Sequence, residues 1–113
     1  MTAKTLRETA DALIAAINAF DADTALTLFA PNALIDDPST GHRFDGHAGI
    51  RDYIERYFIG YHTATLLLSI ESMSETQARV RVDFTGDFGH EIGLLDIMVN
   101  AAGLISRIDA DLE

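Results

Sequence analysis

The apolar residues of this chain change their period near residue 60, and this change constrains the fold more than any other feature. Before it, apolar positions recur every three or four residues, as on one face of a helix. After it, apolar and polar residues alternate, as they do along the strands of a sheet. Helices followed by strands with short connections predict an α+β fold in which the sheet curls around the helices.

Three helices are predicted in the first half of the chain. A capping-box pattern, a threonine followed three residues later by a glutamate, opens a helix over residues 5–20. A second, short helix includes Phe29 and ends at Pro31, because proline lacks the N–H group that a continuing helix needs. A third helix begins at residue 46 or 47 and runs to about residue 58.

Six strands are predicted, two of them short and placed before the third helix. The first strand ends at Asp37, which must be extended because Pro38 follows it. The last four strands are joined by short turns, which makes successive strands antiparallel neighbours. The predicted strands are residues 33–37, 42–45, 63–73, 77–87, 91–100 and 104–112.

The composition restricts the possible sites and partners. A length of 113 residues predicts one domain that spans residues 1–113, and no segment is apolar enough to cross a bilayer. The absence of cysteine excludes disulfides and thiolate chemistry. A formal charge of -10 repels phosphate backbones and anionic lipids, so neither nucleic acid nor a membrane is expected as a partner. We expect a cytoplasmic location.

Both faces of the third long strand are apolar, which predicts a partner for the sheet. An antiparallel sheet with one face in water normally alternates between apolar and polar residues. Helices can cover only one face, so we expect a second copy of the chain to cover the outer face in a homodimer. One face carries Ile92, Leu94, Asp96 and Met98, and the other carries Leu95, Ile97 and Val99.

The stretch Ala25–Phe58, ALTLFAPNALIDDPSTGHRFDGHAGIRDYIERYF, resembles the SnoaL-like and ketosteroid-isomerase-like families. The shared pattern is a helix ending in Leu-Phe-Ala, a strand ending in Asp-Pro, a glycine, and Ile-Arg on a helix face. The four later strands match in order and length, so the resemblance covers nearly the whole chain. It implies the cone of the nuclear-transport-factor-2-like fold, three N-terminal helices packed in a strongly curved mixed or antiparallel sheet.

The resemblance also implies roles for two acids. In the isomerases, an aspartate just before a proline in the first strand is the general base, and Asp37 holds that place. A second aspartate, kept protonated, donates a hydrogen bond to the oxyanion from a late strand, where this chain has Asp96. Leu13 replaces the family's oxyanion phenol, and Ile54 replaces a supporting tyrosine. Losing one oxyanion donor lowers the rate roughly 100- to 1000-fold, and Tyr57 offers a phenol from another direction.

The residues themselves leave alternatives open. Asp36 and Asp37 face opposite sides of a strand, so one enters the core, or both only shape the turn at Pro38. A charged Asp96 on an apolar strand is costly unless it is paired, hydrogen-bonded or protonated, so it is a functional acid or is satisfied by its neighbours. The side chains expected to line a ligand pocket, or otherwise to pack the core, are Leu13, Ile17, Phe29, Tyr53, Ile54, Tyr57, Phe58, Phe84 and Met98.

The predicted function is the binding of a small apolar or polycyclic carbonyl compound, with proton transfer by Asp37 and Asp96, as in an isomerase or a polyketide cyclase. The alternative is a ligand-binding or dimerisation module without turnover. A transport-factor-like, partner-binding protein is supported by the fold alone. The four histidines show no pair at metal-ligand spacing, and no phosphate-binding glycine loop is present, so we expect no metal and no cofactor.

Overall fold

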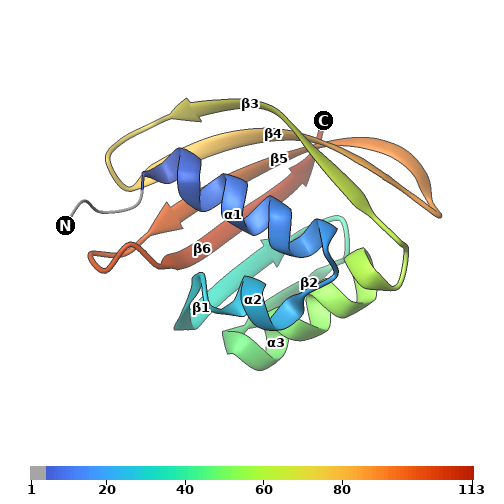
Figure 1. Ribbon diagram of the computed structural model, residues 1–113, viewed down its shortest axis with the longest axis horizontal. Helices are drawn as coiled ribbons and strands as arrows, with labels where there is room; N and C mark the ends of the chain where they lie inside the picture. The colour runs from blue at the N-terminus through green and yellow to red at the C-terminus, as the bar shows by residue number, and fades with distance from the viewer. Residues whose placement is uncertain (1–4) are drawn as a thin grey trace.

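The computed structural model describes residues 5–113, so the first four residues of the predicted domain lie outside it (Figure 1). The helical elements are α1 (Leu6–Asn18), α2 (Ala22–Leu26), α3 (Gly46–Ile54) and a π-helical turn, η1 (Glu55–Ile59). The strands are β1 (Phe29–Asp37), β2 (His42–Asp45), β3 (Ala64–Ser72), β4 (Gln77–Gly86), β5 (Gly89–Val99) and β6 (Ile105–Leu112). None of the helices within residues 5–113 is long and apolar enough to cross a membrane.

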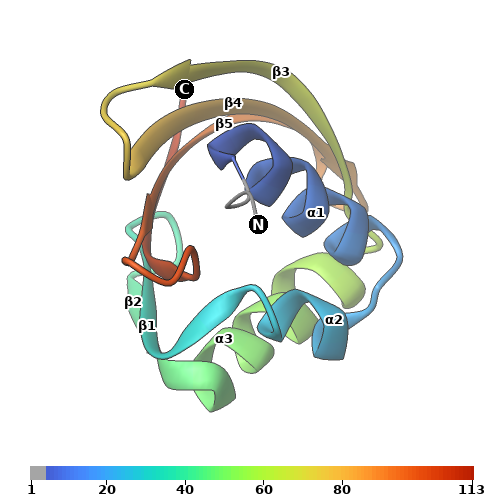
Figure 2. The same ribbon diagram turned by 60° about the vertical axis from the view of Figure 1, so that its left-hand side comes forward.

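Helix α1 begins where the capping box predicts it. The hydroxyl oxygen of Thr5 accepts a hydrogen bond from the N–H of Glu8 at 3.1 Å, and the Glu8 carboxylate accepts one from the N–H of Thr5 at 3.2 Å. These two bonds satisfy donors that a helix start leaves free. The apolar stripe of α1, which includes Ala10, Leu13 and Ile17, is buried, and the helix lies within the curve of the sheet (Figure 2).

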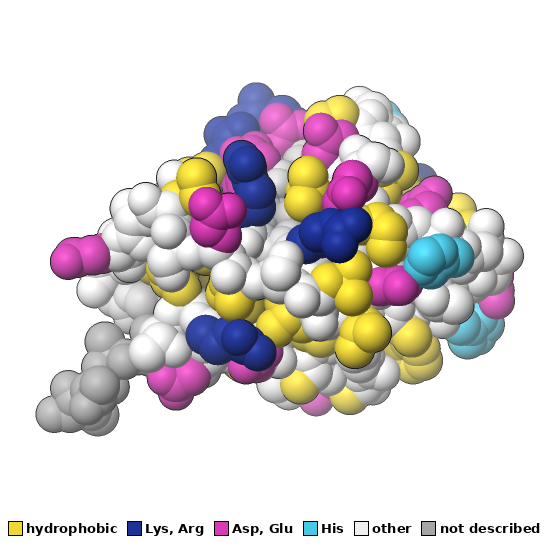
Figure 3. Space-filling model, turned by 90° about the horizontal axis from the view of Figure 1, so that it is seen from above, with side chains coloured by type: hydrophobic (Ala, Val, Ile, Leu, Met, Phe, Trp, Pro, Cys, Tyr) yellow, Lys and Arg dark blue, Asp and Glu magenta, His cyan; other side chains and the backbone are white. Residues whose placement is uncertain are grey.

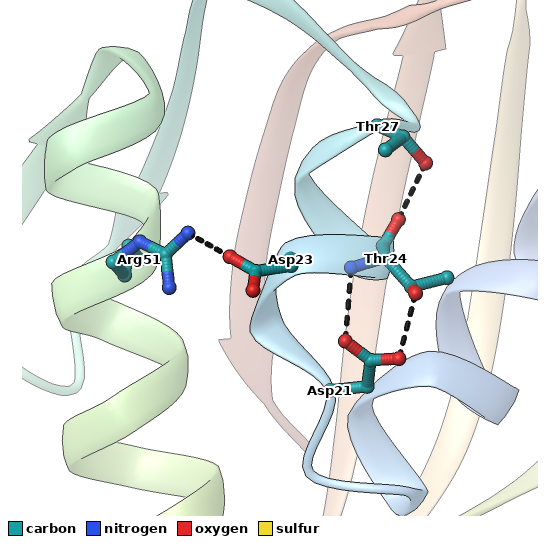
Figure 4. A network of polar contacts seen from close by, with 5 residues as sticks. All are labelled: Asp21, Asp23, Thr24, Thr27 and Arg51. Carbon is teal, nitrogen blue, oxygen red and sulfur yellow. Dashed lines mark hydrogen bonds and ion pairs between the residues drawn. The ribbon is translucent and has the colours of Figure 1, made fainter.

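Polar contacts hold the short helix α2 at its start and at its side (Figure 4). Asp21 caps the helix, accepting hydrogen bonds from the N–H of Thr24 at 3.1 Å and from the Thr24 hydroxyl at 2.6 Å. Asp23 forms an ion pair with Arg51 of α3. This pair ties α2 to α3.

Phe29 lies outside α2, contrary to the sequence prediction. It begins β1, where it is paired with Ile105 of β6, and the N–H of Ile105 donates to the carbonyl of Leu28 at 2.8 Å. The Phe29 side chain is buried in the core. Because the pairing partner lies near the other end of the chain, the local pattern predicted the strand only from residue 33 and missed its start at Phe29.

The sheet is mixed and strongly curved, as predicted. Its strand order is β2-β1-β6-β5-β4-β3. Strands β1 and β6 run parallel, and every other neighbouring pair is antiparallel. The sheet bends around the helices without closing on itself (Figure 2). The predicted α+β cone with three helices is confirmed.

The two faces of the sheet differ in character. The concave face is apolar, and Val80, Val82 and Ile97 are buried there against the helices. The outer face mixes exposed apolar side chains with paired basic and acidic ones (Figure 3). Leu66, for example, is 62% exposed, and Arg81 nearby on the same face pairs with a terminal glutamate. The outer face is therefore neither uniformly apolar nor uniformly charged.

Candidate functional site

A pocket of about 440 Å³ opens at the end of the cone where β1, β4 and β6 finish. Its wall combines a buried carboxylate with six aromatic rings and several small polar groups. This is the composition expected of a site for a flat and largely apolar ligand. The lining residues are Asp37, Ser39, Thr40, Tyr53, Tyr57, Phe58, Tyr61, Thr63, Phe84, Phe88, Glu91 and Leu112.

Asp37 is the last residue of β1 and the buried carboxylate of this pocket. Strand alternation places it on the concave side, while its neighbour Asp36 lies on the outer face near Arg107. One carboxylate oxygen accepts hydrogen bonds from the N–H and the hydroxyl of Ser39 at 3.0 and 2.6 Å, and the other accepts one from the Tyr53 phenol at 2.7 Å. A carboxylate offers about four acceptor positions, so roughly one remains for a ligand.

Tyr53 holds the carboxylate of Asp37 from the α3 side. Burial raises the pKa of the Tyr53 phenol well above its usual range, and the charge of Asp37 and the hydrogen bond to it raise the pKa further. The phenol therefore stays protonated at neutral pH and acts as a donor. Together, Tyr53 and Ser39 fix the orientation of the Asp37 carboxylate.

The Tyr53→Phe variant is expected to resist alkali better than the wild type does. A raised folded-state pKa means that the folded protein keeps a proton that the unfolded chain loses above about pH 10. This contribution to stability is complete below that pH and is lost as the pH rises beyond it. Above about pH 10, the free energy of unfolding of the wild type should fall more steeply than that of the variant, by about 1 kcal/mol between pH 10 and pH 11. Urea titrations at pH 9, 10 and 11 measure both slopes, and parallel slopes would contradict the assignment.

Six aromatic rings form a continuous chain along the pocket wall. Neighbouring ring centroids lie 5.4 to 6.1 Å apart, at interplanar angles of 48° to 78°. Tilted and edge-to-face geometries of this kind are favourable for aromatic pairs. In order toward the mouth, the rings are Phe84, Phe58, Tyr53, Tyr57, Tyr61 and Phe88. The last two are 44% and 40% exposed, so the chain runs from the core to solvent.

The π-helical turn η1 positions part of this wall. The sequence predicts an ordinary helix up to about residue 58, but α3 ends at Ile54 and η1 follows it. In a π-turn the backbone hydrogen bonds join residues five apart, and with this wider turn Phe58 lines the same pocket as Tyr53 of α3. The turn ends at Gly60, where a Cβ atom would lie only 2.7 Å from the carbonyl oxygen of Arg56. Glycine is therefore required at this stop.

Asp96 does not reach the pocket, and the predicted convergence of two acids in one cavity is wrong. Its neighbours Leu95 and Ile97 are buried on the concave face, so alternation places Asp96 on the outer face. There the Nε of Arg79 donates to its carboxylate at 2.9 Å. The alternative interpretation, an acid satisfied by a neighbouring group, describes Asp96.

The other predicted lining residues divide into three groups. Those that line the pocket are Tyr53, Tyr57, Phe58 and Phe84. Those that line only a deeper apolar hollow of about 30 Å³ are Leu13, Ile17, Phe29 and Ile54. This hollow has the size of about one water molecule, so the deep part of the cone is filled by its own side chains. Met98 alternates with the buried Ile97 and lies on the outer face.

Sequence reasoning missed the rim of the pocket. Of the missed residues, only Ser39 carries a local signal, because an aspartate often accepts the N–H two residues later in a turn. Thr40 lies next to Ser39 in the same turn, where its hydroxyl donates to the carbonyl of Asp37 at 2.8 Å. The remaining residues come from segments far from Asp37 along the chain and reach the pocket through strand pairing and loop placement. The missed residues are Ser39, Thr40, Tyr61, Thr63, Phe88, Glu91 and Leu112.

The pocket offers groups that transfer protons and form hydrogen bonds. Asp37 can accept a proton, and the phenols can donate hydrogen bonds. Two histidines near the open end form surface pairs instead, His62 with Asp87 at 2.9 Å and His90 with Asp83 at 2.8 Å. Within residues 5–113, no three histidine or acidic side chains are grouped as metal ligands.

Several solved structures share this fold. A candidate ketosteroid isomerase from Kribbella flavida has a TM-score of 0.83 and 20% identity, covering 95% of this chain and 76% of its own. A candidate polyketide cyclase from Sinorhizobium meliloti has a TM-score of 0.82 and 20% identity, covering 91% and 93%. A Mycobacterium tuberculosis protein in complex with estradiol-17β-hemisuccinate has a TM-score of 0.81 and 17% identity, covering 96% and 93%.

The sequence itself identifies the family. No curated protein matches the chain. The model of the SnoaL-like domain, however, matches residues 10–107, a range that extends from α1 into β6 and includes Asp37. The resemblance inferred from the sequence is thereby confirmed, and the chain belongs to the SnoaL-like domain family.

Proposed function

We propose that the pocket binds a small, flat carbonyl compound and that Asp37 transfers a proton at the carbon next to the carbonyl. The observation that carries this proposal is a carboxylate, 7% exposed, in the wall of an aromatic pocket of about 440 Å³. A buried base beside an apolar ligand is shielded from water, which favours proton abstraction from carbon. An isomerase or a cyclase of the SnoaL-like kind uses such a step.

The proposed step needs only groups of this pocket. The C–H bond breaks, its proton passes to a carboxylate oxygen of Asp37, and its electron pair forms the C=C bond of an enolate as the carbonyl π pair moves to the oxygen. Asp37 then returns the proton to the same carbon or to another one. Tyr57 is proposed as the oxyanion donor, since its phenol lines the pocket and forms no hydrogen bond to another residue within 5–113. Asp96 cannot serve because it lies on the outer face.

Two of the structural neighbours support the choice of ligand. The Mycobacterium tuberculosis protein was solved with an estradiol ester, and a designed protein with a TM-score of 0.83 and 17% identity is a 17-OHP binder. Both ligands are polycyclic. The aromatic wall of this pocket suits the same shape.

The experiment that tests the proposal is proton exchange on a model ketone. The protein is incubated with 2-tetralone in D₂O, and the loss of the proton signals next to the carbonyl is followed by NMR. Exchange faster than in buffer alone, with saturation in ketone concentration, is the expected result. Saturable binding without faster exchange would contradict the proton-transfer step.

That second outcome corresponds to the alternative function, a ligand-binding module without turnover. One observation favours this alternative. Three hydrogen bonds from Ser39 and Tyr53 already engage the Asp37 carboxylate and occupy acceptor positions that a base would turn toward its substrate. The exchange experiment separates the two functions, because both predict binding and only one predicts exchange.

We also propose that a second copy of the chain covers the outer face of the sheet. Leu66 and Leu68 are 62% and 40% exposed on β3, beside arginine–carboxylate pairs that a twofold partner can complement.

The Leu66→Asp variant is expected to raise the dissociation constant of the dimer by about tenfold or more, since the new charge would be buried in the interface. Sedimentation equilibrium measures this, with Phe20→Asp as the control because Phe20 is 41% exposed at the C-terminal end of α1. A monomeric wild type at micromolar concentration would contradict the proposal.

A further inference from the structure

The wall of the pocket is acidic and has no basic side chain among residues 5–113. Its two carboxylates are Asp37 and Glu91. Glu91 shares the concave side of β5 with Gly93 and Leu95, and it is exposed because it lies at the open end of the cone. A ligand in the pocket therefore lies between a buried carboxylate and one at the mouth.

The basic side chains Arg56 and His62 near the pocket already have partners. The guanidinium carbon of Arg56 lies 5.6 Å from the ring centroid of Tyr57, and Arg56 is paired with Asp52 at 3.4 Å. His62 is paired with Asp87 at 2.9 Å. The whole chain carries a formal charge of -10, so its long-range field adds to the local one.

The aromatic wall also favours a cation over an anion. The faces of tyrosine and phenylalanine rings carry negative charge density and attract ammonium groups. Tyr61 and Phe88, at a centroid distance of 6.1 Å, place such faces at the mouth, where Glu91 also lies. An anion at this position would be repelled by the Glu91 carboxylate beside it.

We propose that this pocket selects its ligand by charge. It binds a flat carbonyl compound that carries an ammonium group and rejects the counterpart that carries a carboxylate. The Glu91 carboxylate makes this distinction, because it attracts the first group and repels the second. The inference rests on the proposed function, since it assigns a substrate class to the same pocket. The ring system lies against the aromatic wall, the carbon next to the carbonyl group faces Asp37, and the ammonium group lies at the mouth beside Glu91.

Three matched ligands test this inference. Dissociation constants are measured by calorimetry at pH 7 for 2-tetralone, its 6-aminomethyl derivative and its 6-carboxymethyl derivative. The amine is expected to bind roughly tenfold more tightly than the neutral ketone, and the acid roughly tenfold more weakly. In Glu91→Gln the ratio between amine and acid should shrink, and in Glu91→Lys it should invert. Glu75→Gln removes the same charge from the β3–β4 turn and should keep the wild-type ratio.

The outcomes separate this inference from the proposed function. Equal affinity for the three ligands, or a ratio unchanged in Glu91→Lys, overturns the charge selection and leaves ketone binding intact. Binding of none of the three at millimolar concentration overturns the proposed function and this inference together. A ratio that falls equally in Glu91→Gln and Glu75→Gln overturns the role of Glu91, because it would reflect net charge alone.

Discussion

The Asp37→Asn variant is expected to lose proton exchange on 2-tetralone by about 10²- to 10⁴-fold, the usual contribution of a positioned base. The amide keeps the shape of the carboxylate, so the hydrogen bonds from Ser39 can persist while the basic group is removed. Binding of the ketone should survive, since the aromatic wall is unchanged. Exchange rates by NMR and dissociation constants by calorimetry distinguish a chemical loss from a binding loss.

The neighbouring residue provides a matched control. Asp36→Asn makes the same change one position earlier on β1, on the outer face, where Asp36 lies 3.5 Å from Arg107. The rate of proton exchange on 2-tetralone in this variant should stay within about twofold of the wild-type rate, because a side chain on the outer face couples only weakly to the pocket. Equal losses in both variants would point to net charge or folding. Full exchange in Asp37→Asn would refute the assignment of Asp37 as the base.

The Phe58→Ala variant is expected to lose about 3–5 kcal/mol in the free energy of unfolding, the usual cost of removing a buried phenylalanine ring. Phe58 is 7% exposed and packs against Tyr53 and Phe84 at centroid distances of 5.7 and 5.8 Å. Its ring lines both the pocket and the deeper hollow of about 30 Å³. Removing the ring should join the two spaces. The loss is a large part of the roughly 5–15 kcal/mol that holds a domain folded.

Urea unfolding at pH 7 measures the loss, with Phe88→Ala as the control. Phe88 is 40% exposed at the mouth, so its replacement should cost under about 1 kcal/mol. Both rings line the pocket, and only Phe58 supports the core. A cost for Phe58→Ala as small as that for Phe88→Ala would mean that the ring contributes little to packing. If Phe58→Ala binds a ligand too large for the wild type and Phe88→Ala does not, the pocket and the deeper hollow are joined at the place of the Phe58 ring.

Local patterns predicted the elements because the signals for helix ends and strands act over a few residues. The capping box at Thr5 began α1 as expected, and residues 42–45 formed β2 within the predicted bounds. The extended backbone before Pro38 placed Asp37 at the end of β1. The β3–β6 bounds also agree with the predicted strands to within two residues.

The candidate site was predictable only in part. The family pattern pointed to Asp37, which the structure places in the pocket wall beside Tyr53. The same pattern pointed to Asp96, which pairs with Arg79 on the opposite face of the sheet. Alternation along a strand shows which residues share a face, and it does not show which face meets the helices when both carry apolar side chains.

The sequence by itself determined the order of helices and strands, the family, and a short list of polar residues, because each depends on neighbours along the chain. The tertiary structure alone decided three further matters. Side chains fill the deep part of the cone around Leu13 and Ile54. Glu91 lies at the rim of the pocket that contains Asp37, and Asp96 lies on the outer face of the sheet. These outcomes depend on the volumes of side chains and on the register of strands that lie far apart in the sequence. Both are settled only when the whole sheet has packed around the helices.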